Sequence, residues 1–326
     1  MVSFAPLSRS DSYCPLARVA MIVLTVSALS ATNLILLGCS DSREGRSDDR
    51  PQVLATTGMI ADAARRIAGE HVGVETLMAP GVDPHLYKAS AGDVRRFQAA
   101  DLILYNGLFL EGKLGDILTK LASRRRVVAV AEAVPIDQRL ASEVVGGEYD
   151  PHVWFDVGLW THVCQSVREE LALLAPQHAA EFEKNFADYK NELLELDKWV
   201  EREVATIPPS TRVLVTAHDA FGYFGRQYSI KVVGLQGLST VTQAGLTDVQ
   251  RVVELILDRK IKAVFIESSI PRRTIEAVQA ACRDRGHEVA IGGELYSDSV
   301  GPKGSGAEQY VSMVRHNVNT LVQALR

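Results

Sequence analysis

Residues 178–209 read HAAEFEKNFADYKNELLELDKWVEREVATIPP, and this stretch interrupts the alternation of strand-like and helix-like runs, which then resumes. Apolar side chains recur in it every three or four residues from Phe182 to Val200, which is the spacing of a helix. Pro208 and Pro209 end the run, because proline disfavours the helical conformation of the residue before it. Thirty helical residues span about 45 Å, so we expect this helix to join two lobes. The alternative is an unusually long helix packed inside a single domain.

Short β-rich runs alternate with helical runs on both sides of this stretch. Before it we expect strands at 52–57, 72–77, 102–106 and 126–130, with helices at 59–68, 90–99, 114–123 and 157–174. After it we expect strands at 212–216, 230–234, 263–267 and 288–293, with helices at 221–227, 246–258, 272–285 and 307–325. Such alternation predicts an α/β fold of two lobes, each a mostly parallel sheet with flanking helices, joined by one long rigid helix.

The N-terminus has the pattern of a bacterial lipoprotein signal. Arg9 and Arg18 precede an uncharged apolar run, 19–37, which ends in Gly38-Cys39. We therefore expect a signal peptide over 1–38, lipid on Cys39, and a flexible polar tether over 39–51. The alternative is a permanent membrane anchor, which the polar residues within the run make less suitable. The expected domains are then an N-terminal lobe at 52–175, a linking helix at 176–209 and a C-terminal lobe at 210–326.

The charge and the cysteine content argue against nucleic-acid binding and against a thiolate site. The formal net charge of −5 gives no basic footprint for nucleic acid. Of the four cysteines, Cys14 lies in the expected signal peptide and Cys39 is expected to carry lipid, whereas Cys164 and Cys282 lie in separate predicted helices. They form either a disulfide or two buried thiols, and we expect buried thiols. The sequence has no CxxC pair, so it indicates no thiolate metal or redox site.

Three of the eight histidines occupy predicted loops beside residues that turn or stiffen the backbone. His85 and His152 each end an Asp-Pro-His triplet, and His218 follows the predicted strand 212–216. Asp298 lies past the strand 288–293, after a pair of glycines. Ligands collect at the carboxyl ends of parallel strands, so we expect each lobe to offer two of these residues to one cation between the lobes. Three imidazoles and a carboxylate suit a divalent first-row metal, whereas calcium and magnesium prefer oxygen ligands.

Other residues are weaker candidates. Three histidines fall in helical runs and two precede strands, at the opposite end of the sheet: His162, His178 and His316, and His71 and His287. Glu267 ends a predicted strand, where it either orients a ligand imidazole or forms a salt bridge. The sequence has no HExxH, no GxSxG and no glycine-rich phosphate loop.

Several motifs together resemble the metal-binding solute receptors of bacterial ABC importers, of the TroA-like type within cluster A-I. The matching runs include TGMIAD (57–62), GVDPHLY (81–87), NGL (106–108), DPHVWFD (150–156), TAHDAFGYF (216–224), FIESS (265–269) and GGELYSD (292–298). They are distributed along most of residues 52–326, in the same order as in the family. The resemblance implies two lobes joined by a long helix, with little closure on binding. It places the family's ligands on the same four residues: His85, His152, His218 and Asp298.

Two departures bear on the metal. Many zinc receptors of this family have a histidine-rich loop before the second ligand, but residues 134–150 contain no histidine. Many manganese receptors have glutamate at the third ligand position, where this chain has His218. A closed four-ligand shell suits Zn(II), and a bidentate Asp298 would ease binding of Mn(II). We expect both to bind, zinc more tightly, as transported ligand and without an organic cofactor. Which of zinc, manganese and iron is the physiological cargo stays open.

The resemblance implies a monomeric, lipid-anchored carrier outside the cytoplasmic membrane, in the periplasm or on the outer face of that membrane. It would deliver its metal to an ABC permease driven by a cytoplasmic ATPase, with no role in catalysis and no contact with nucleic acid. The alternatives are a metal-dependent hydrolase with Glu267 as general base, a surface adhesin, and a receptor for another small solute. Imidazole and carboxylate groups at the expected site favour a metal over an organic solute.

Overall fold

The computed structural model describes residue 1 and residues 49–142 and 149–326. The predicted signal peptide, Cys39 and most of the predicted tether lie outside these residues. Residues 50–326 form one compact unit, and it is described below. No helix within the described part is both long enough and apolar enough to cross a membrane.

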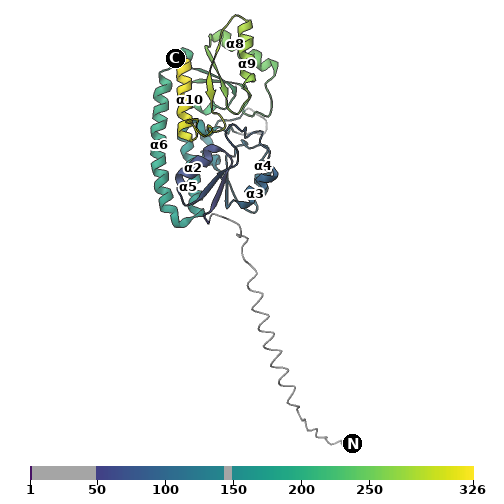
Figure 1. Cartoon of the computed structure of the whole chain (residues 1–326), viewed down its shortest axis with the longest axis vertical. Helices are drawn as coiled ribbons and strands as arrows, with labels where there is room; N and C mark the ends of the chain where they lie inside the picture. The colour runs from purple at the N-terminus through teal and green to yellow at the C-terminus, as the bar shows by residue number, and fades with distance from the viewer. Residues whose placement is uncertain (2–48, 143–148) are drawn as a thin grey trace. The chain divides into compact units, whose positions relative to one another are not determined.

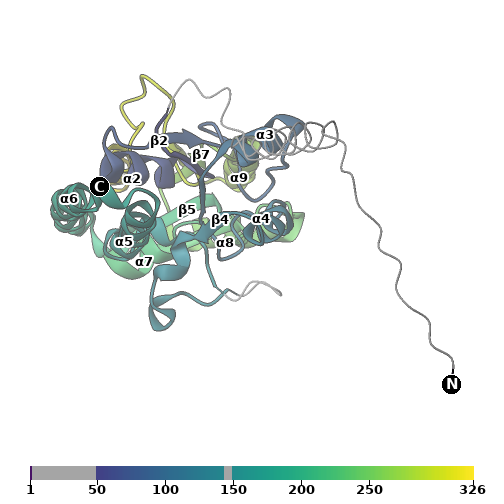
Figure 2. The same ribbon diagram turned by 90° about the horizontal axis from the view of Figure 1, so that it is seen from below.

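The first sheet contains four parallel strands in the order β2-β1-β3-β4. These strands are β1 (Gln52–Ala55), β2 (Gly73–Thr76), β3 (Leu102–Tyr105) and β4 (Arg126–Ala129). The helices between and after them are α2 (Gly58–Ala68), α3 (Ala91–Ala99), α4 (Gly115–Ala122) and α5 (Val157–Leu174). Figure 2 shows α2, α5 and α6 on one side of this sheet and α4 on the other.

Side chains of β1 show why this sheet is covered on both faces. Val53 and Ala55 belong to the core cluster shared with α2, α5 and α6, whereas Leu54 belongs to the cluster under α3 and α4. Successive side chains of a strand point to opposite faces, so an uninterrupted apolar strand requires helices on both. The sequence alternation predicted this arrangement, and the structure confirms it.

The long helix is α6 (Ala179–Ala205), and it runs beside both groups of strands (Figure 1). Its buried side chains follow the predicted helical spacing and contribute to the main core cluster. They are Phe182, Phe186, Tyr189, Leu193, Leu196, Val200 and Val204. At 27 residues it is about 40 Å long. The C-terminal helix α10 (Tyr310–Leu325) packs against α6 and also contacts α2.

The second group of strands consists of two parallel pairs, β5-β6 and β7-β8, with β5 and β7 beside each other. Their bounds are β5 (Val213–His218), β6 (Lys231–Gln236), β7 (Ala263–Glu267) and β8 (Ala290–Leu295). The helices α7 (Gly222–Tyr228), α8 (Leu246–Arg259) and α9 (Arg273–Asp284) connect them. Short 3-10 turns occur at Val130–Ala133, Ile136–Gln138, Val153–Phe155, Pro176–His178 and Pro209–Thr211.

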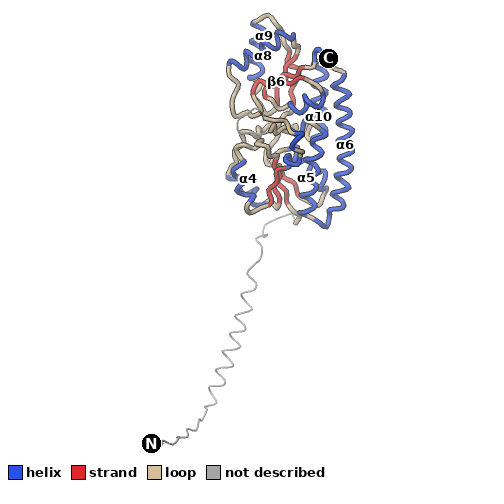
Figure 3. The backbone as a smooth tube through the Cα atoms, turned by 180° about the vertical axis from the view of Figure 1, so that it is seen from behind, coloured by secondary structure: helices blue, strands red, loops and turns tan. Residues whose placement is uncertain are grey.

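The two groups of strands are separated by loops, as Figure 3 shows. The chain is therefore a two-lobed α/β protein of the predicted class, and every predicted strand and helix forms within a few residues of its expected bounds. Cys164 and Cys282 are both free and buried, as expected of two apolar thiols.

Candidate metal centre

His85 lies in the loop that follows β2, and hydrogen bonds hold this loop at both ends of the Asp-Pro-His triplet. Asp83 Oδ1 accepts a hydrogen bond of 2.8 Å from the backbone N–H of His85. Asp83 Oδ2 accepts one of 2.6 Å from the Thr240 hydroxyl, which belongs to the other lobe. Gly81 has a φ of +78°, which favours glycine, and its N–H donates to Ser299 Oγ at 2.9 Å. The first ligand candidate is thus fixed partly by its own loop and partly by the opposite lobe.

The segment after His85 is fixed by the start of α3. Ser90 is the N-cap of α3 and forms a capping box with Asp93. Asp93 Oδ2 accepts hydrogen bonds from the Ser90 N–H at 2.8 Å and from the Tyr87 hydroxyl at 2.9 Å. Burial by itself raises the pKa of Asp93, but hydrogen bonds from Ser90, Tyr87 and Arg96 outweigh it and lower the pKa to about 2. Asp93 is therefore an ionised anchor for the loop that contains His85.

His152 is the last residue of the second Asp-Pro-His triplet, just before the short 3-10 turn Val153–Phe155. Asp150 Oδ1 accepts a hydrogen bond of 2.9 Å from the His152 backbone N–H and lies 2.7 Å from Nδ1 of the same imidazole. A carboxylate at this distance requires a proton on Nδ1, which leaves Nε2 as a free donor for a metal. Asp150 thus contacts the imidazole as well as the backbone of its own triplet, whereas Asp83 accepts a hydrogen bond only from the backbone N–H of His85 within its triplet.

His218 is the last residue of β5, and Glu267 is the last residue of the neighbouring β7. Glu267 Oε1 accepts a hydrogen bond of 2.9 Å from the His218 backbone N–H, and Oε2 lies 2.6 Å from His218 Nδ1. The carboxylate therefore orients this imidazole, and Nε2 is directed away from it. The sequence offered two interpretations of Glu267, namely that it orients a ligand imidazole or that it forms a salt bridge. The contact with His218 is consistent with both.

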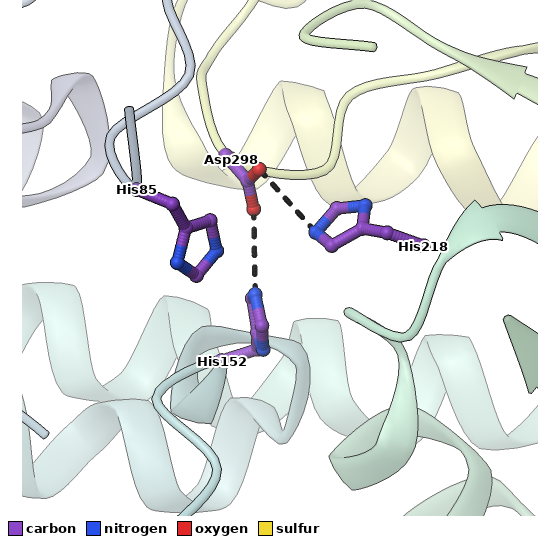
Figure 4. A group of neighbouring side chains, drawn as sticks. All are labelled: His85, His152, His218 and Asp298. Atoms are coloured by element: carbon purple, nitrogen blue, oxygen red, sulfur yellow. Dashed lines mark ion pairs between the residues drawn. The ribbon is translucent and has the colours of Figure 1, made fainter. Parts of the chain in front are cut away.

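The four predicted residues converge at one point between the lobes (Figure 4). Each offers one ligand atom, and these atoms all lie within 4.8 Å of one another. His152 Nε2 lies 3.6 Å from Asp298 Oδ1, and His218 Nε2 lies 3.4 Å from Asp298 Oδ2. Donors bound tetrahedrally at zinc distances lie about 3.4 Å apart, so the spacing of Asp298 from its two neighbours fits a shared cation.

Burial and unmet hydrogen bonds also indicate a cation. His152 and His218 are 0% exposed, Asp298 is 1% exposed and His85 is 2% exposed. Among the described residues, the Nε2 atoms of all three histidines and Asp298 Oδ1 are buried atoms that lack a hydrogen-bond partner. Buried polar atoms in proteins are rarely left without a partner. Four such atoms facing one another could hold a metal ion, and the residue types match the ligands that first-row divalent metals prefer.

Burial and the nearby charges together set the pKa values of His85 and His218. Burial lowers the pKa of His85 to about 3, so this side chain is a neutral donor at pH 7. Burial also lowers the pKa of His218, but the charges of Glu267 and Asp298 outweigh it and raise that pKa well above its usual value. The pKa of Asp298 is lowered, because the nearby histidines outweigh the effect of burial. A proton on His218 therefore competes with a cation for the site.

Contacts between the lobes surround the candidate centre. Trp154 Nε1 donates to the Ser297 carbonyl at 2.9 Å, one residue before Asp298. The Tyr223 hydroxyl donates to the Asp150 carbonyl at 3.0 Å. Each contact links a segment beside a ligand candidate in one lobe to the other lobe. The sequence contains Trp154 and Tyr223 within the resembling motifs, but it gave no signal for these specific partners.

Gly222, the first residue of α7, is a further residue of the site that no sequence pattern indicated. A Cβ atom built on Gly222 would lie 2.9 Å from Asp150 Oδ2, closer than an ordinary contact. Glycine at this position therefore makes room for the carboxylate that orients His152. The histidines set aside from the sequence, His162, His287 and His316, lie outside the four-residue group, as expected.

The chain matches known metal-binding proteins over most of its length. Residues 53–324 match the family model described as zinc-uptake complex component A, periplasmic. The manganese-binding lipoprotein MntA of Bacillus subtilis (strain 168) is 49% identical over 304 residues, which cover 93% of this chain and 99% of the relative. The zinc-binding protein TroA of Treponema pallidum (strain Nichols) is 50% identical over 284 residues, which cover 87% of this chain and 92% of the relative.

A solved structure agrees with these relatives. The periplasmic zinc-binding protein TroA from Treponema pallidum superposes with a TM-score of 0.82 at 50% identity, covering 85% of this chain and 99% of that structure. Three observations therefore indicate the same class of metal-binding protein. They are the two lobes, the family match across both of them, and the buried group of three histidines and one aspartate. The chain belongs to the ZnuA family, whose model is described as the periplasmic component A of a zinc-uptake complex.

Proposed function

We propose that this protein captures a divalent transition metal, Zn(II) or Mn(II), outside the cytoplasmic membrane and delivers it to an ABC permease. The ligands are His85, His152, His218 and Asp298. The observation that supports this most directly is that one ligand atom from each of these four buried residues lies close to the others. The three imidazole Nε2 atoms and Asp298 Oδ1 also lack hydrogen-bond partners. The named cargo of the relatives, manganese for MntA and zinc for TroA, supports the metal class.

The donor set favours zinc as the tighter ligand. Three imidazoles and one carboxylate complete a tetrahedral shell for Zn(II), which also binds nitrogen and oxygen donors more strongly than Mn(II). Binding of Mn(II) is favoured by a different feature of the site. Both carboxylate oxygens of Asp298 face the other three residues, one towards His152 and one towards His218. A bidentate Asp298 raises the coordination number to five, which suits Mn(II). We therefore propose that both metals bind, with zinc the tighter.

The site suits a carrier better than a hydrolase. A hydrolytic zinc site needs an open position for water, and four protein ligands with exposures of 0–2% fill the shell. Glu267, the candidate general base, is engaged with the Nδ1 and backbone N–H of His218. The names of three relatives also describe binding proteins: MntA is a manganese-binding lipoprotein, TroA is a zinc-binding protein, and PsaA of Streptococcus anginosus is a manganese ABC transporter substrate-binding lipoprotein. The transport partner, the lipid on Cys39 and a monomeric state are parts of this proposal.

Metal titration of variants tests the proposed ligands. In a competition titration against a chromophoric chelator, His218→Ala and Asp298→Ala are expected to lose tight binding of both metals. His316→Ala, at a half-buried histidine whose Nε2 contacts the Glu294 carbonyl, is the control and is expected to bind like the wild type. Elemental analysis of the natively expressed protein then identifies the cargo. Wild-type affinity in both ligand variants would reject the site.

A further inference from the structure

A second group of metal-binding side chains lies away from the buried centre, at the start of α6. It consists of His71, His178 and Glu181, whose ligand atoms all lie within 4.8 Å of one another. His71 belongs to the connection between α2 and β2, while His178 immediately precedes α6 and Glu181 lies in its first turn. Neither histidine is a strong candidate from the sequence, since His178 falls in a helical run and His71 precedes a strand, at the opposite end of the sheet.

The side chains of this group are already in contact. His71 Nε2 lies 2.7 Å from Glu181 Oε2. The rings of His71 and His178 are stacked, with centroids 3.7 Å apart and planes inclined by 15°. Two imidazoles and a carboxylate thus meet although His71 and His178 are far apart in sequence. This combination of donors is one that Zn(II) commonly uses.

The backbone under this group is fixed. Phe182 is fully buried, and its ring centroid lies 6.2 Å from that of His71 and 6.1 Å from that of His178. Asn185 Nδ2 donates to the Ile67 carbonyl at 3.1 Å, which ties α6 to the end of α2. The scaffold is therefore held by packing and hydrogen bonds that do not depend on the three side chains themselves.

The outer atoms of the group retain freedom to adjust. The side chain of His71 is 29% exposed and that of Glu181 is 52% exposed. Donors around a tetrahedral zinc ion lie about 3.4 Å apart, so some of the present separations must shorten. Small rotations of half-exposed side chains achieve this without a change of backbone. Solvent then completes the coordination, because the protein supplies only three ligands.

We propose that His71, His178 and Glu181 form a second, solvent-accessible Zn(II) site that links the α2–β2 connection to the start of α6. It is weaker than the buried centre, since it has three ligands and they are partly solvated. This site binds Mn(II) less tightly than Zn(II), because nitrogen donors favour zinc over manganese. The site stands on its own contacts and is independent of the function proposed for the buried centre.

Zinc stoichiometry of the full chain tests the second site. The wild type is expected to bind two equivalents of Zn(II) in isothermal titration, the first tighter than the second. His71→Ala and His178→Ala are expected to lose the second equivalent and to keep the first. His316→Ala is the matched control and is expected to keep both. Conversely, His218→Ala is expected to lose the first equivalent and keep the second, which separates the two proposals.

Two further measurements guard against a merely structural explanation. Glu181→Gln keeps a side chain that can hydrogen-bond His71 but removes the charge, so the second equivalent is expected to weaken while the melting temperature without zinc stays unchanged. Zinc is also expected to protect His71 and His178 from modification by diethyl pyrocarbonate, read by mass spectrometry. A single equivalent of zinc in the wild type, or a second equivalent that survives both histidine substitutions, would overturn the proposal.

Discussion

Gly222 and Gly115 are each the first residue of a helix, α7 and α4, but only Gly222 lies against the candidate metal centre. A Cβ atom on Gly222 would lie 2.9 Å from Asp150 Oδ2, whereas a Cβ on Gly115 would meet no atom within 4 Å. Asp150 cannot turn away freely, because its Oδ1 accepts from the His152 N–H and contacts Nδ1 of the same residue. Gly222→Ala is therefore expected to displace the carboxylate and turn the imidazole that it orients.

The magnitude follows from the size of this displacement. Ordinary contacts of a Cβ begin at 3.4 Å, so the carboxylate must move by about 0.5 Å. Disturbing a partner that orients a metal ligand typically costs about 10–100-fold in metal affinity, which is about 1.4–2.7 kcal/mol. Both substitutions also reduce the conformational freedom of the unfolded chain, which changes the folding stability rather than the zinc affinity. That effect is common to the pair and cancels when the two variants are compared.

A competition titration with a chromophoric zinc chelator at pH 7 measures the effect, and thermal unfolding of the same samples checks the fold. We expect Gly222→Ala to weaken zinc binding by at least about tenfold, and Gly115→Ala to bind like the wild type. If Gly222→Ala retained the wild-type affinity, Asp150 would not hold His152 in place. An equal loss in both variants would show that alanine at a helix start, rather than the contact with Asp150, causes the effect.

Four further outcomes follow from the same contacts. Glu267→Gln is expected to weaken zinc binding by about 10–100-fold, because the amide can donate to His218 Nδ1 and shift its proton to Nε2; unchanged affinity in the chelator titration would contradict this. Asp93→Asn is expected to cost about 2 kcal/mol at pH 7, since the folded pKa of about 2 lies below the ordinary 3.8. That stability is present above pH 4 and lost as the pH falls towards 2, so the difference between wild type and variant in urea unfolding should shrink over this range, and a constant difference would refute it. Thr240→Val removes the 2.6 Å hydrogen bond to Asp83 and is expected to lower the unfolding free energy by about 1.5–3 kcal/mol, with Thr211→Val as a control whose hydroxyl bonds only backbone carbonyls. Zinc binding at pH 7 is expected to release about one proton per ion from His218, whose pKa is raised by Glu267 and Asp298; calorimetry in buffers of different ionisation enthalpy measures it, and a heat that does not depend on the buffer would contradict it.

Most of the fold could be predicted because its signals are local. The apolar spacing from Phe182 to Val200 specifies one helix, and the prolines after it specify its end. The alternation of strands and helices likewise specifies parallel sheets, whose carboxyl ends then bring His85, His152, His218 and Asp298 to one region. The convergence of the four residues is therefore a consequence of topology that a linear pattern reveals.

The surroundings of these residues could not be predicted, because they depend on side-chain directions across the lobes. Asp83 and Asp150 occupy the same position in identical triplets, and both accept a hydrogen bond from the following histidine N–H. Only Asp150 also contacts the imidazole of its own triplet, whereas the second oxygen of Asp83 reaches Thr240 in the other lobe. The stacked pair of His71 and His178 is a similar case, since its two members are brought together only by the packing of α6 beside α2.

The buried centre also explains how a bound metal and the fold depend on each other. Asp150, Glu267 and Asp298 place three carboxylates beside three imidazoles where almost no solvent reaches. Buried carboxylates are costly unless a positive charge lies close to them, and either a proton or a divalent cation provides one. A cation that binds only the folded chain adds stability by mass action, about 2.7 kcal/mol at a concentration one hundred times its Kd. Because the proposed ligands come from both lobes, that energy would stabilise the contact between the lobes.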